Sequence, residues 1–196
     1  MKIGAVVLAA GRSERMGRPK ALLPCRGRTF LRTILDTLAG TGIRDVRVVL
    51  GEGAGEIRDE ETLHEEIVVV NARYEEGMLS SVRCGVLALA PDVEGFFLWP
   101  VDHPLVRTDT LGEIIRVFEA GKGGIVVPLY DGRRGHPAVF AARIVPLLLS
   151  APDQVGARAV LRDHPAEVAE ISVPDPGVVT DIDTPEAYRT VFGDAP

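Results

Sequence analysis

The chain of 196 residues carries 22 lysines and arginines against 28 aspartates and glutamates, which gives a formal net charge of −6. A chain of this length is typical of one domain and buries about 70% of its unfolded surface, so it needs no metal or disulfide to fold. Its 46% hydrophobic and 26% charged residues exclude a disordered chain, and the acidic balance argues against a general nucleic-acid binder.

Short apolar runs alternate with segments of helical period over the first two thirds of the chain. Five runs are nearly all apolar, as expected of strands covered on both faces: Ile3–Leu8, Val46–Leu50, Ile67–Val70, Gly95–Trp99 and Ile125–Val127. Between them, apolar residues recur every three or four positions in Phe30–Leu38, Leu79–Leu89 and Leu111–Phe118. This alternation predicts an α/β fold with a largely parallel sheet.

The pattern changes in the last third of the chain. Asp131–Gly132 is typical of a turn, and the apolar runs Ile125–Tyr130 and Ala138–Ala141 lie on either side of it. This order predicts an antiparallel excursion from the parallel sheet. Further on, Thr184–Pro185–Glu186 predicts a helix start, because it supplies a capping hydroxyl, a proline at the first helical position and an acid in the first turn.

Other local features bear on the compartment and the loops. The run Ile3–Ala10 is too short to cross a membrane and has no signal-peptide cleavage site in the usual layout, so we expect a buried first strand. Cys25 and Cys84 lack the spacing of a zinc site or a secreted disulfide framework and predict reduced thiols in a cytoplasmic protein. Pro152–Gly156 and Pro174–Gly177 are expected to be surface loops.

The net charge conceals an asymmetry along the chain. Residues 1–32 hold eight basic side chains and a single acid, Glu14, a balance of +7. The other 164 residues carry 14 basic and 27 acidic groups, a balance of −13. Such an asymmetry marks either an anion-binding site or a solvated segment, and the residues around the charges decide between the two.

Half of these eight basic side chains fall in the segment Leu8–Lys20, which reads L-A-A-G-R-S-E-R-M-G-R-P-K. The predicted apolar strand ends at Ala10, and a loop follows it. The two glycines of this loop, Gly11 and Gly17, permit positive φ and a close approach of the backbone to a ligand. The loop amides, together with the four cations Arg12, Arg15, Arg18 and Lys20, predict a polyphosphate cradle at the carboxyl end of the strand. A solvated basic loop is the alternative interpretation.

Two better-known phosphate motifs are excluded. A Walker A loop needs G-x-x-x-x-G-K-[ST], and neither Gly11 nor Gly17 fits that spacing. The three glycines Gly51, Gly53 and Gly55 follow the second predicted strand but do not form G-x-G-x-x-G. The sequence therefore supports neither a P-loop ATPase nor a standard dinucleotide-binding enzyme.

Carboxylates occur at two places where a metal could be held. Asp102 follows the apolar run Gly95–Pro100 and so lies at the carboxyl end of a predicted strand, where a carboxylate can hold Mg²⁺. A turn or helix-capping aspartate before Pro104 is the alternative. Asp181 and Asp183 offer a second carboxylate, and both would face one side of an extended segment, so the residues alone do not choose between them.

Five segments in order are similar to those of the nucleotidyltransferases related to molybdenum cofactor cytidylyltransferase. They are Leu8–Lys20, Asn71 through Gly77–Ser81, Pro100–Val106, Arg134–Pro137 and Asp181–Glu186, within a resemblance that extends from Ile3 to about Tyr188. Val101 and His103 depart from the pattern of the family. The resemblance implies a single-domain Rossmann-like three-layer α/β/α nucleotidyltransferase fold over residues 1–196, with a mostly parallel mixed sheet.

The resemblance also implies an activity. It points to transfer of CMP from CTP to a molybdopterin-type acceptor with release of pyrophosphate, dependent on Mg²⁺ with Mn²⁺ as the alternative ion. A molybdoenzyme would be the client of the product, and neither nucleic acid nor membrane is an expected partner. Ala10 and Pro19 favour the cytidylyl branch, because guanylyl relatives tend to carry a glycine and an acid there. The alternatives are a cytidylyl- or uridylyltransferase acting on a sugar or polyol phosphate, and a non-catalytic accessory protein that binds molybdenum cofactor.

Residue roles carry over onto the matching positions. The resemblance implies catalytic roles for Arg15, Lys20 and Asp102, and metal binding by Asp102 and Asp181, with Asp183 as a turn or helix-start residue. The nucleotide-binding residues would be Leu8, Ala9, Ala10, Gly11, Arg12, Ser13, Lys20, Gly77, Ser80 and Ser81. The acceptor-binding residues would be Arg134, Gly135, His136 and Pro137. On local sequence alone, Ser80 or Ser81 could instead cap a helix. The acceptor segment Arg134–Pro137 could likewise be a structural hairpin.

Overall fold

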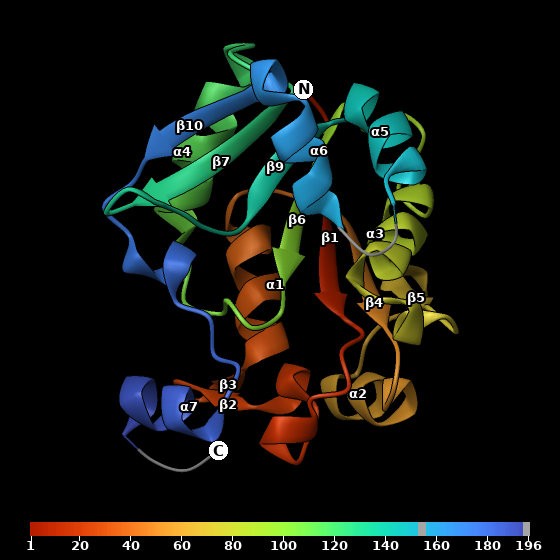
Figure 1. Cartoon of the computed structure of the whole chain (residues 1–196). Coiled ribbons are helices and arrows are strands. Elements are labelled where there is room, and N and C mark those ends of the chain that lie inside the picture. The colour runs from red at the N-terminus through yellow and green to blue at the C-terminus, as the bar shows by residue number, and fades with distance from the viewer. Residues whose placement is uncertain (153–155, 194–196) are drawn as a thin grey trace.

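A mixed sheet of eight strands forms the centre of the computed structural model, which describes residues 1–152 and 156–193. β1 (Ile3–Ala9) pairs in parallel with β4 (Asp45–Leu50) on one side and with β6 (Gly95–Pro100) on the other. β5 (Val68–Val70) continues this parallel half of the sheet beyond β4. The carboxyl ends of these four strands therefore meet at one edge of the sheet, at the lower end of β1 in Figure 1.

The other half of the sheet contains the antiparallel excursion. β9 (Ala138–Ala141) runs antiparallel between β6 and β7 (Ile125–Tyr130), and β10 (Val168–Ser172) pairs in parallel with the far side of β7. The short β8 (Arg133–Arg134) turns back onto β7 through Asp131–Gly132, whose positive φ values of 49° and 71° are those of a tight hairpin turn. The predicted turn and excursion are confirmed.

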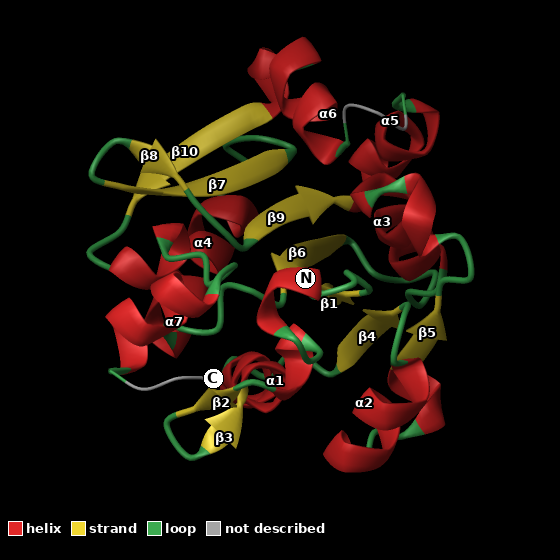
Figure 2. Ribbon diagram, turned by 60° about the horizontal axis from the view of Figure 1, so that its bottom comes forward, coloured by secondary structure: helices red, strands yellow, loops and turns green. Residues whose placement is uncertain are grey.

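Helices cover both faces of the sheet (Figures 1 and 2). One apolar core joins Ala5, Val7 and Ala9 of β1 to the helices α1 (Phe30–Gly40), α2 (Ala54–Glu61), α4 (Thr108–Glu119) and α7 (Pro185–Phe192). The other joins Val6 and Leu8 to α3 (Met78–Leu87), α5 (Val145–Ser150) and α6 (Ala157–Asp163). Because alternate residues of β1 enter opposite cores, the strand is apolar throughout, and the predicted three-layer α/β/α fold is confirmed.

Most predicted elements occur within two or three residues of their expected bounds. The predicted helix start at Thr184 is confirmed, because its hydroxyl accepts a hydrogen bond from the amide of Ala187 at 3.2 Å. The sequence did not predict the hairpin of β2 (Pro24–Cys25) and β3 (Arg28–Thr29), whose strands have two residues each. Within the described residues, none of the helices is long and apolar enough to cross a membrane.

One loop prediction holds only in part, and another lies partly outside the described residues. In Pro174–Gly177 both prolines are exposed, as expected of a surface loop, but Asp175 is only 2% exposed. Its Oδ2 accepts hydrogen bonds from the amide of Arg107 at 2.9 Å and the hydroxyl of Thr110 at 2.6 Å, which anchors the turn against α4. Of the predicted loop Pro152–Gly156, residues 153–155 fall outside the part of the chain that the structure describes.

Candidate active site

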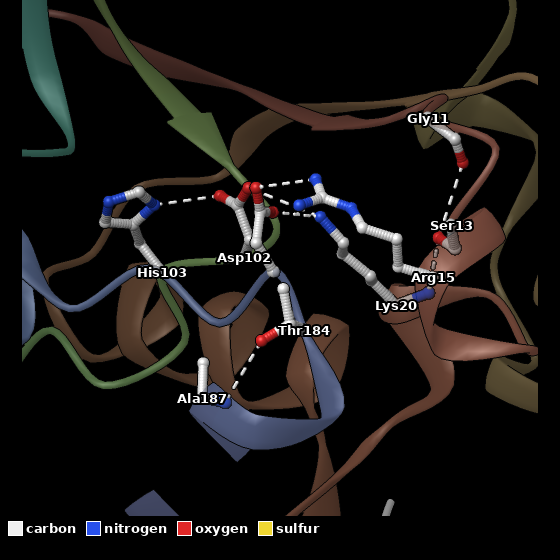
Figure 3. Close-up of polar contacts among 9 residues, drawn as sticks. Gly11, Ser13, Arg15, Lys20, Asp102, His103, Thr184 and Ala187 are labelled. Carbon is white, nitrogen blue, oxygen red and sulfur yellow. Dashed lines mark hydrogen bonds and ion pairs between the residues drawn. The ribbon is translucent and has the colours of Figure 1, made fainter. Parts of the chain in front are cut away.

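The loop that leaves β1 turns back on itself through Ser13. The Ser13 Oγ accepts a hydrogen bond from the Lys20 amide at 3.0 Å and donates to the Gly11 carbonyl at 3.5 Å, so one side chain joins both ends of the loop (Figure 3). Ser13 and Gly17 have positive φ values of 52° and 70°, whereas Gly11 does not. A Cβ placed on Gly11 would meet no atom within 4 Å. The loop thus exposes the backbone at Gly11 to open space.

A cavity of about 290 Å³ lies between this loop, α3 and the end of β6; we call it the loop cavity. Its lining includes eight of the predicted site residues: Leu8, Ala9, Ala10, Gly11, Ser13, Lys20, Ser81 and Asp102. Tyr74, Met78 and Asp183 also line it. Tyr74 and Met78 lie within the segment from Asn71 to Ser81 that carries the resemblance, but they were not among the predicted site residues. Asp183 is one of the two carboxylates between which the residues alone did not choose.

Two of the predicted cations point elsewhere. Arg12 forms ion pairs with Glu14 and Glu75 and does not line the loop cavity. Arg18 lies 4.0 Å from Glu60. Arg12 and Arg18 instead line a separate hollow on the other side of the loop. Four cations in one loop therefore do not converge on one point, because the positive-φ turns at Ser13 and Gly17 distribute them over two sides.

The two remaining cations, Lys20 and Arg15, converge on carboxylates (Figure 3). The Lys20 ammonium is hydrogen-bonded to Asp183 Oδ1 and lies 3.7 Å from Asp102 Oδ2. Arg15 donates to Asp183 Oδ2 at 3.2 Å. The side chains of Lys20, Asp102 and Asp183 are 17%, 22% and 34% exposed, so water screens this cluster only in part.

The geometry favours Asp183 over Asp181 as the second carboxylate. The backbone amide of Ile182 donates to the Asp102 carbonyl at 2.9 Å, and the Ile182 side chain is fully buried. This anchor brings Asp183 into the cluster with Lys20, whereas Asp181 is exposed and does not line the loop cavity. The segment belongs to no strand, so the period of two does not govern its side chains.

Asp102 is held ionised by its surroundings. Burial opposes its ionisation, but the hydrogen bond to His103 Nδ1 at 2.8 Å and the nearby charges of His103 and Lys20 outweigh it. The pKa of Asp102 falls to about 2 as a result. The backbone of His103 is held in turn by Trp99, because the His103 carbonyl accepts a hydrogen bond from the indole N–H of the buried Trp99 at 3.0 Å.

His136 packs behind His103. The two imidazole rings meet edge to face with their centroids 4.9 Å apart. Burial, followed by the charge on His103, lowers the pKa of His136 to about 4, so its ring is neutral at neutral pH. The preceding residue must be glycine, because a Cβ on Gly135 would lie 2.3 Å from the carbonyl oxygen of Val178.

A second cavity, of about 320 Å³, opens on the other side of Asp102; we call it the arginine cavity. Its lining residues are Met78, Pro100, Asp102, His103, Arg133, Arg134, His136, Arg158, Val179, Asp181 and Asp183. Asp102 and Asp183 line both cavities, so the carboxylates lie at the junction between them. This junction is the main chemical feature of the site.

Only two of the four predicted acceptor-binding residues line the arginine cavity. Arg134 and His136 line the arginine cavity, whereas Gly135 and Pro137 are buried and do not. Arg134 forms an ion pair with Glu170 at 2.7 Å. Arg133 and Arg158, which were not predicted as site residues, have no carboxylate partner among the described residues. They are the cations best placed to receive an anion in the arginine cavity.

A buried amide holds the serines of α3. Asn71, only 2% exposed, donates to Ser80 Oγ at 2.8 Å and Ser81 Oγ at 2.9 Å. Neither serine caps the helix, because the N-cap is Gly77 and makes no side-chain capping bond. Ser80 turns back to the carbonyls of Gly77 and Arg73 and, like Gly77, does not line the loop cavity. Ser81 therefore remains as the serine that faces the cavity.

The donor set suits a small divalent cation that substrate oxygens help to hold. In the described part of the chain, no three His, Cys, Asp or Glu side chains are grouped so as to hold a metal ion by themselves. Asp102 and Asp183 supply two carboxylates beside an open cavity. Mg²⁺ is bound in this way in phosphate-transferring sites, through one or two carboxylates with waters and substrate phosphates. The residues present fit such an ion.

Comparison with known proteins identifies the family. MobA-like NTP transferase domains match residues 5–168, so the chain belongs to that family and is a nucleotidyltransferase. Nicotine blue oxidoreductase of Paenarthrobacter nicotinovorans is 35% identical over 95% of each chain. Molybdenum cofactor cytidylyltransferase of Escherichia coli is 27% identical over 96% of this chain and 94% of its own length.

Solved structures share the fold of this chain. The crystal structure of Rv0371c from Mycobacterium tuberculosis superposes with a TM-score of 0.84 and 31% identity, over 100% of both chains. A second crystal structure of that protein is a complex with manganese and has a TM-score of 0.78, again over 100% of both chains. A protein that is 29% identical to this chain and shares its fold thus binds a divalent metal in a crystal.

Proposed function

We propose that this nucleotidyltransferase moves CMP from CTP to a phosphate group of a molybdopterin-type acceptor and releases pyrophosphate, within one domain that spans residues 1–196. One observation carries the proposal: Asp102 and Asp183 lie at the junction of the loop cavity and the arginine cavity. A donor phosphate in the first cavity and an acceptor phosphate in the second would meet at these carboxylates. The similarity to molybdenum cofactor cytidylyltransferase supports the identity of the substrates.

The reaction is a displacement at phosphorus. An oxygen of the acceptor phosphate forms a bond to the α-phosphorus of CTP, and the bond from that phosphorus to the α,β-bridging oxygen breaks. Pyrophosphate leaves with the bridging oxygen, and the product contains a new diphosphate linkage. The acceptor phosphate is already ionised near neutral pH, so the protein contributes mainly position and charge neutralisation.

On the donor side, the loop cavity holds the nucleotide. The backbone from Leu8 to Ser13 would lie along the phosphates, with Lys20 and Arg15 as the cations that reach them. Ser81, held by Asn71, would face the nucleoside. Arg12, Gly77 and Ser80 would act indirectly, because they do not line the cavity.

Asp102 and Asp183 would hold Mg²⁺, or Mn²⁺ in its place, with Asp181 as the alternative second ligand. When bound, the ion neutralises charge on the α-phosphate and on the oxygen that approaches it. The low pKa of Asp102, about 2, keeps this carboxylate ionised across the physiological range. His103 holds its other oxygen, which leaves Oδ2 turned toward Lys20.

On the acceptor side, Arg133, Arg134 and Arg158 would receive the phosphate. His136 is neutral at neutral pH, so it would contribute a hydrogen bond and shape but no charge. Gly135 and Pro137 would set the backbone path of this segment. A molybdoenzyme is the client that such a product implies.

The decisive experiment measures pyrophosphate release from CTP, GTP, UTP and ATP with Mg²⁺, each with and without molybdopterin, and identifies the product by mass spectrometry. The proposal predicts release from CTP that depends on molybdopterin. Turnover of CTP or UTP with a sugar or polyol phosphate would favour that alternative acceptor class. Binding of molybdenum cofactor without turnover of any triphosphate would favour an accessory protein. Because one relative is named as an oxidoreductase, the same samples should also be followed for a change in redox state.

A further inference from the structure

A histidine that departs from the family pattern is hydrogen-bonded to one oxygen of Asp102. The side chain of His103 is only 10% exposed, and its Nδ1 lies 2.8 Å from Asp102 Oδ1. An ionised carboxylate has no proton to donate, so Nδ1 carries the proton and is the donor in this bond. Oδ1 of Asp102 is therefore occupied by a group of the chain itself.

His103 is held in place by contacts on several sides. Its amide donates to the Pro100 carbonyl at 3.2 Å, and its carbonyl accepts the indole N–H of the fully buried Trp99 at 3.0 Å. Its ring meets the edge of the His136 ring, with the two centroids 4.9 Å apart. Because backbone and ring are both fixed, His103 cannot follow the Asp102 carboxylate if that group rotates.

The two oxygens of Asp102 have different partners. His103 and Lys20 lie on opposite sides of the carboxylate, and the Lys20 ammonium is 3.7 Å from Oδ2 (Figure 3). Lys20 lines the loop cavity, whereas His103 lines the arginine cavity. A cation that takes the place of the Lys20 ammonium would meet Oδ2. To contact both oxygens at once, it would need the carboxylate to rotate and lose the hydrogen bond from His103.

Asp183 is constrained less firmly than Asp102. Arg15 donates to its Oδ2, but the Arg15 side chain is 65% exposed, so water competes for this bond and the side chain is free to leave. Lys20 holds the other oxygen, Oδ1. The fixed restriction at the junction of the two cavities is therefore the bond from His103 to Asp102.

The number of oxygens that a carboxylate offers discriminates between divalent cations. Mg²⁺ demands near-ideal octahedral geometry, and a carboxylate that binds through both oxygens spans too narrow an angle for it. Ca²⁺ is larger, takes about six to eight oxygen ligands in a flexible arrangement and accepts both oxygens of one carboxylate. Mn²⁺ shares the preference for octahedral oxygen ligands. A carboxylate restricted to one oxygen thus favours the smaller ions.

We propose that His103 is a positioning residue that limits Asp102 to one metal-facing oxygen and thereby makes this enzyme select Mg²⁺ or Mn²⁺ over Ca²⁺. This inference rests on the proposed function, because Asp102 holds the divalent ion in that reaction. It assigns the choice of cation to a residue that was not among the predicted site residues.

The test measures metal binding to the full chain without turnover. Mn²⁺ binding is followed by electron paramagnetic resonance, and Ca²⁺ is then added to displace it, which gives the ratio of the two affinities. His103→Asn keeps an N–H donor at the position of Nδ1, whereas His103→Leu has a similar size and no donor. The ratio should fall about tenfold or more in favour of Ca²⁺ in His103→Leu and stay at the wild-type value in His103→Asn.

Further variants separate the hydrogen bond from packing. His103→Phe keeps a ring against His136 but has no donor, so it should shift the ratio as His103→Leu does, and it decides the result if His103→Leu does not fold. His64→Leu replaces an exposed histidine and should keep the wild-type ratio. A wild-type ratio in the folded donor-free variants, or an equal fall in His103→Asn, would overturn the proposal.

Asp102→Asn distinguishes this inference from the proposed function. We expect it to lose most of the Mn²⁺ affinity of the wild type. If it binds Mn²⁺ as the wild type does, the metal assignment in the proposed function is wrong, and the role of His103 is overturned with it. If Asp102→Asn loses Mn²⁺ while folded His103→Leu keeps the wild-type ratio, the role of His103 alone is overturned.

Discussion

The ammonium group of Lys20 is hydrogen-bonded to the carboxylate of Asp183. It also lies 3.7 Å from Asp102 Oδ2, so a cation of the chain sits beside both carboxylates that we assign to a divalent ion. Two positive centres cannot share this space without strong repulsion. If a metal binds at these carboxylates, Lys20 would therefore turn away, and the phosphates of the donor nucleotide would offer it a new partner. Metal and triphosphate binding should be coupled through this one side chain.

Replacing Lys20 tests the coupling. Lys20→Met removes the competing charge, so we expect Mn²⁺ to bind about tenfold more tightly in the absence of nucleotide, the change that ~1.4 kcal/mol produces. The same variant should bind triphosphate more weakly. Titration of Mn²⁺ followed by electron paramagnetic resonance measures the first effect. Arg18→Met is the matched control, because it removes a cation of the same loop that lies beside Glu60. Unchanged or weaker Mn²⁺ binding in Lys20→Met would count against the coupling.

The choice of the second carboxylate is tested by a pair of substitutions two residues apart. Asp183→Asn should weaken Mn²⁺–CTP binding and lower kcat/KM by about 10²-fold, the scale on which a preorganised charge acts. Asp181→Asn should have only a small effect, because Asp181 is exposed and outside the loop cavity. Initial rates of pyrophosphate release and Mn²⁺ titration give both values. A reversed order of the two effects would restore Asp181 as the ligand.

Gly11 should matter for the ligand and not for the fold. A Cβ at Gly11 meets no protein atom within 4 Å, so Gly11→Ala should change the free energy of unfolding by no more than about 0.5 kcal/mol. We expect it to weaken triphosphate binding by about tenfold or more, because the phosphates need close approach to this backbone. Urea denaturation and nucleotide titration check the two expectations.

Gly135 provides the opposite case. A Cβ there would lie 2.3 Å from the Val178 carbonyl oxygen, so Gly135→Ala should destabilise the fold by about 1–3 kcal/mol. If Gly11→Ala were the more destabilising of the two, the proposed role of the loop would be wrong.

His136 makes the stability of the fold depend on pH. Its pKa falls from 6.5 to about 4 on folding, so below pH 6.5 the unfolded chain takes up a proton that the folded chain does not. This proton uptake favours the unfolded chain. The free energy of unfolding is therefore at its full value above pH 6.5 and decreases progressively as the pH falls toward 4. Urea denaturation near pH 7 and about pH 5 should show this loss in the wild type and a smaller one in His136→Gln. His64→Gln, at an exposed histidine, should behave like the wild type.

Much of the site could be predicted because it lies close to regular elements. Asp102 follows a strand whose apolar run is evident in the sequence, and the structure places it at the carboxyl end of β6. The helix start at Thr184 has a local cause, a capping hydroxyl followed by proline, and it occurs where that cause predicts. Interactions between residues that are close together in the chain can be predicted directly from the local sequence.

Other features could not be predicted, because partners far away in the chain decide them. Arg12 turns toward Glu75, 63 residues further along, and so leaves the cavity that its loop forms. Arg133 joins the site only because the β7–β8 hairpin carries it to the carboxylates. Neither contact has a signal in the local sequence.

The sequence by itself determined the α/β fold and the family, and it predicted that the first loop binds phosphate. Hydrophobic periodicity and the glycine-rich segment that ends at Lys20 depend on residues close together in the chain, so they can be recognised from the sequence without the folded structure. The tertiary structure decided which carboxylate joins Asp102. The Ile182 amide binds the Asp102 carbonyl, 80 residues away in the chain, and this hydrogen bond turns Asp183 toward Lys20 and leaves Asp181 exposed. The direction of a side chain in an irregular segment depends on that segment's anchors, and only the folded chain brings those anchors together.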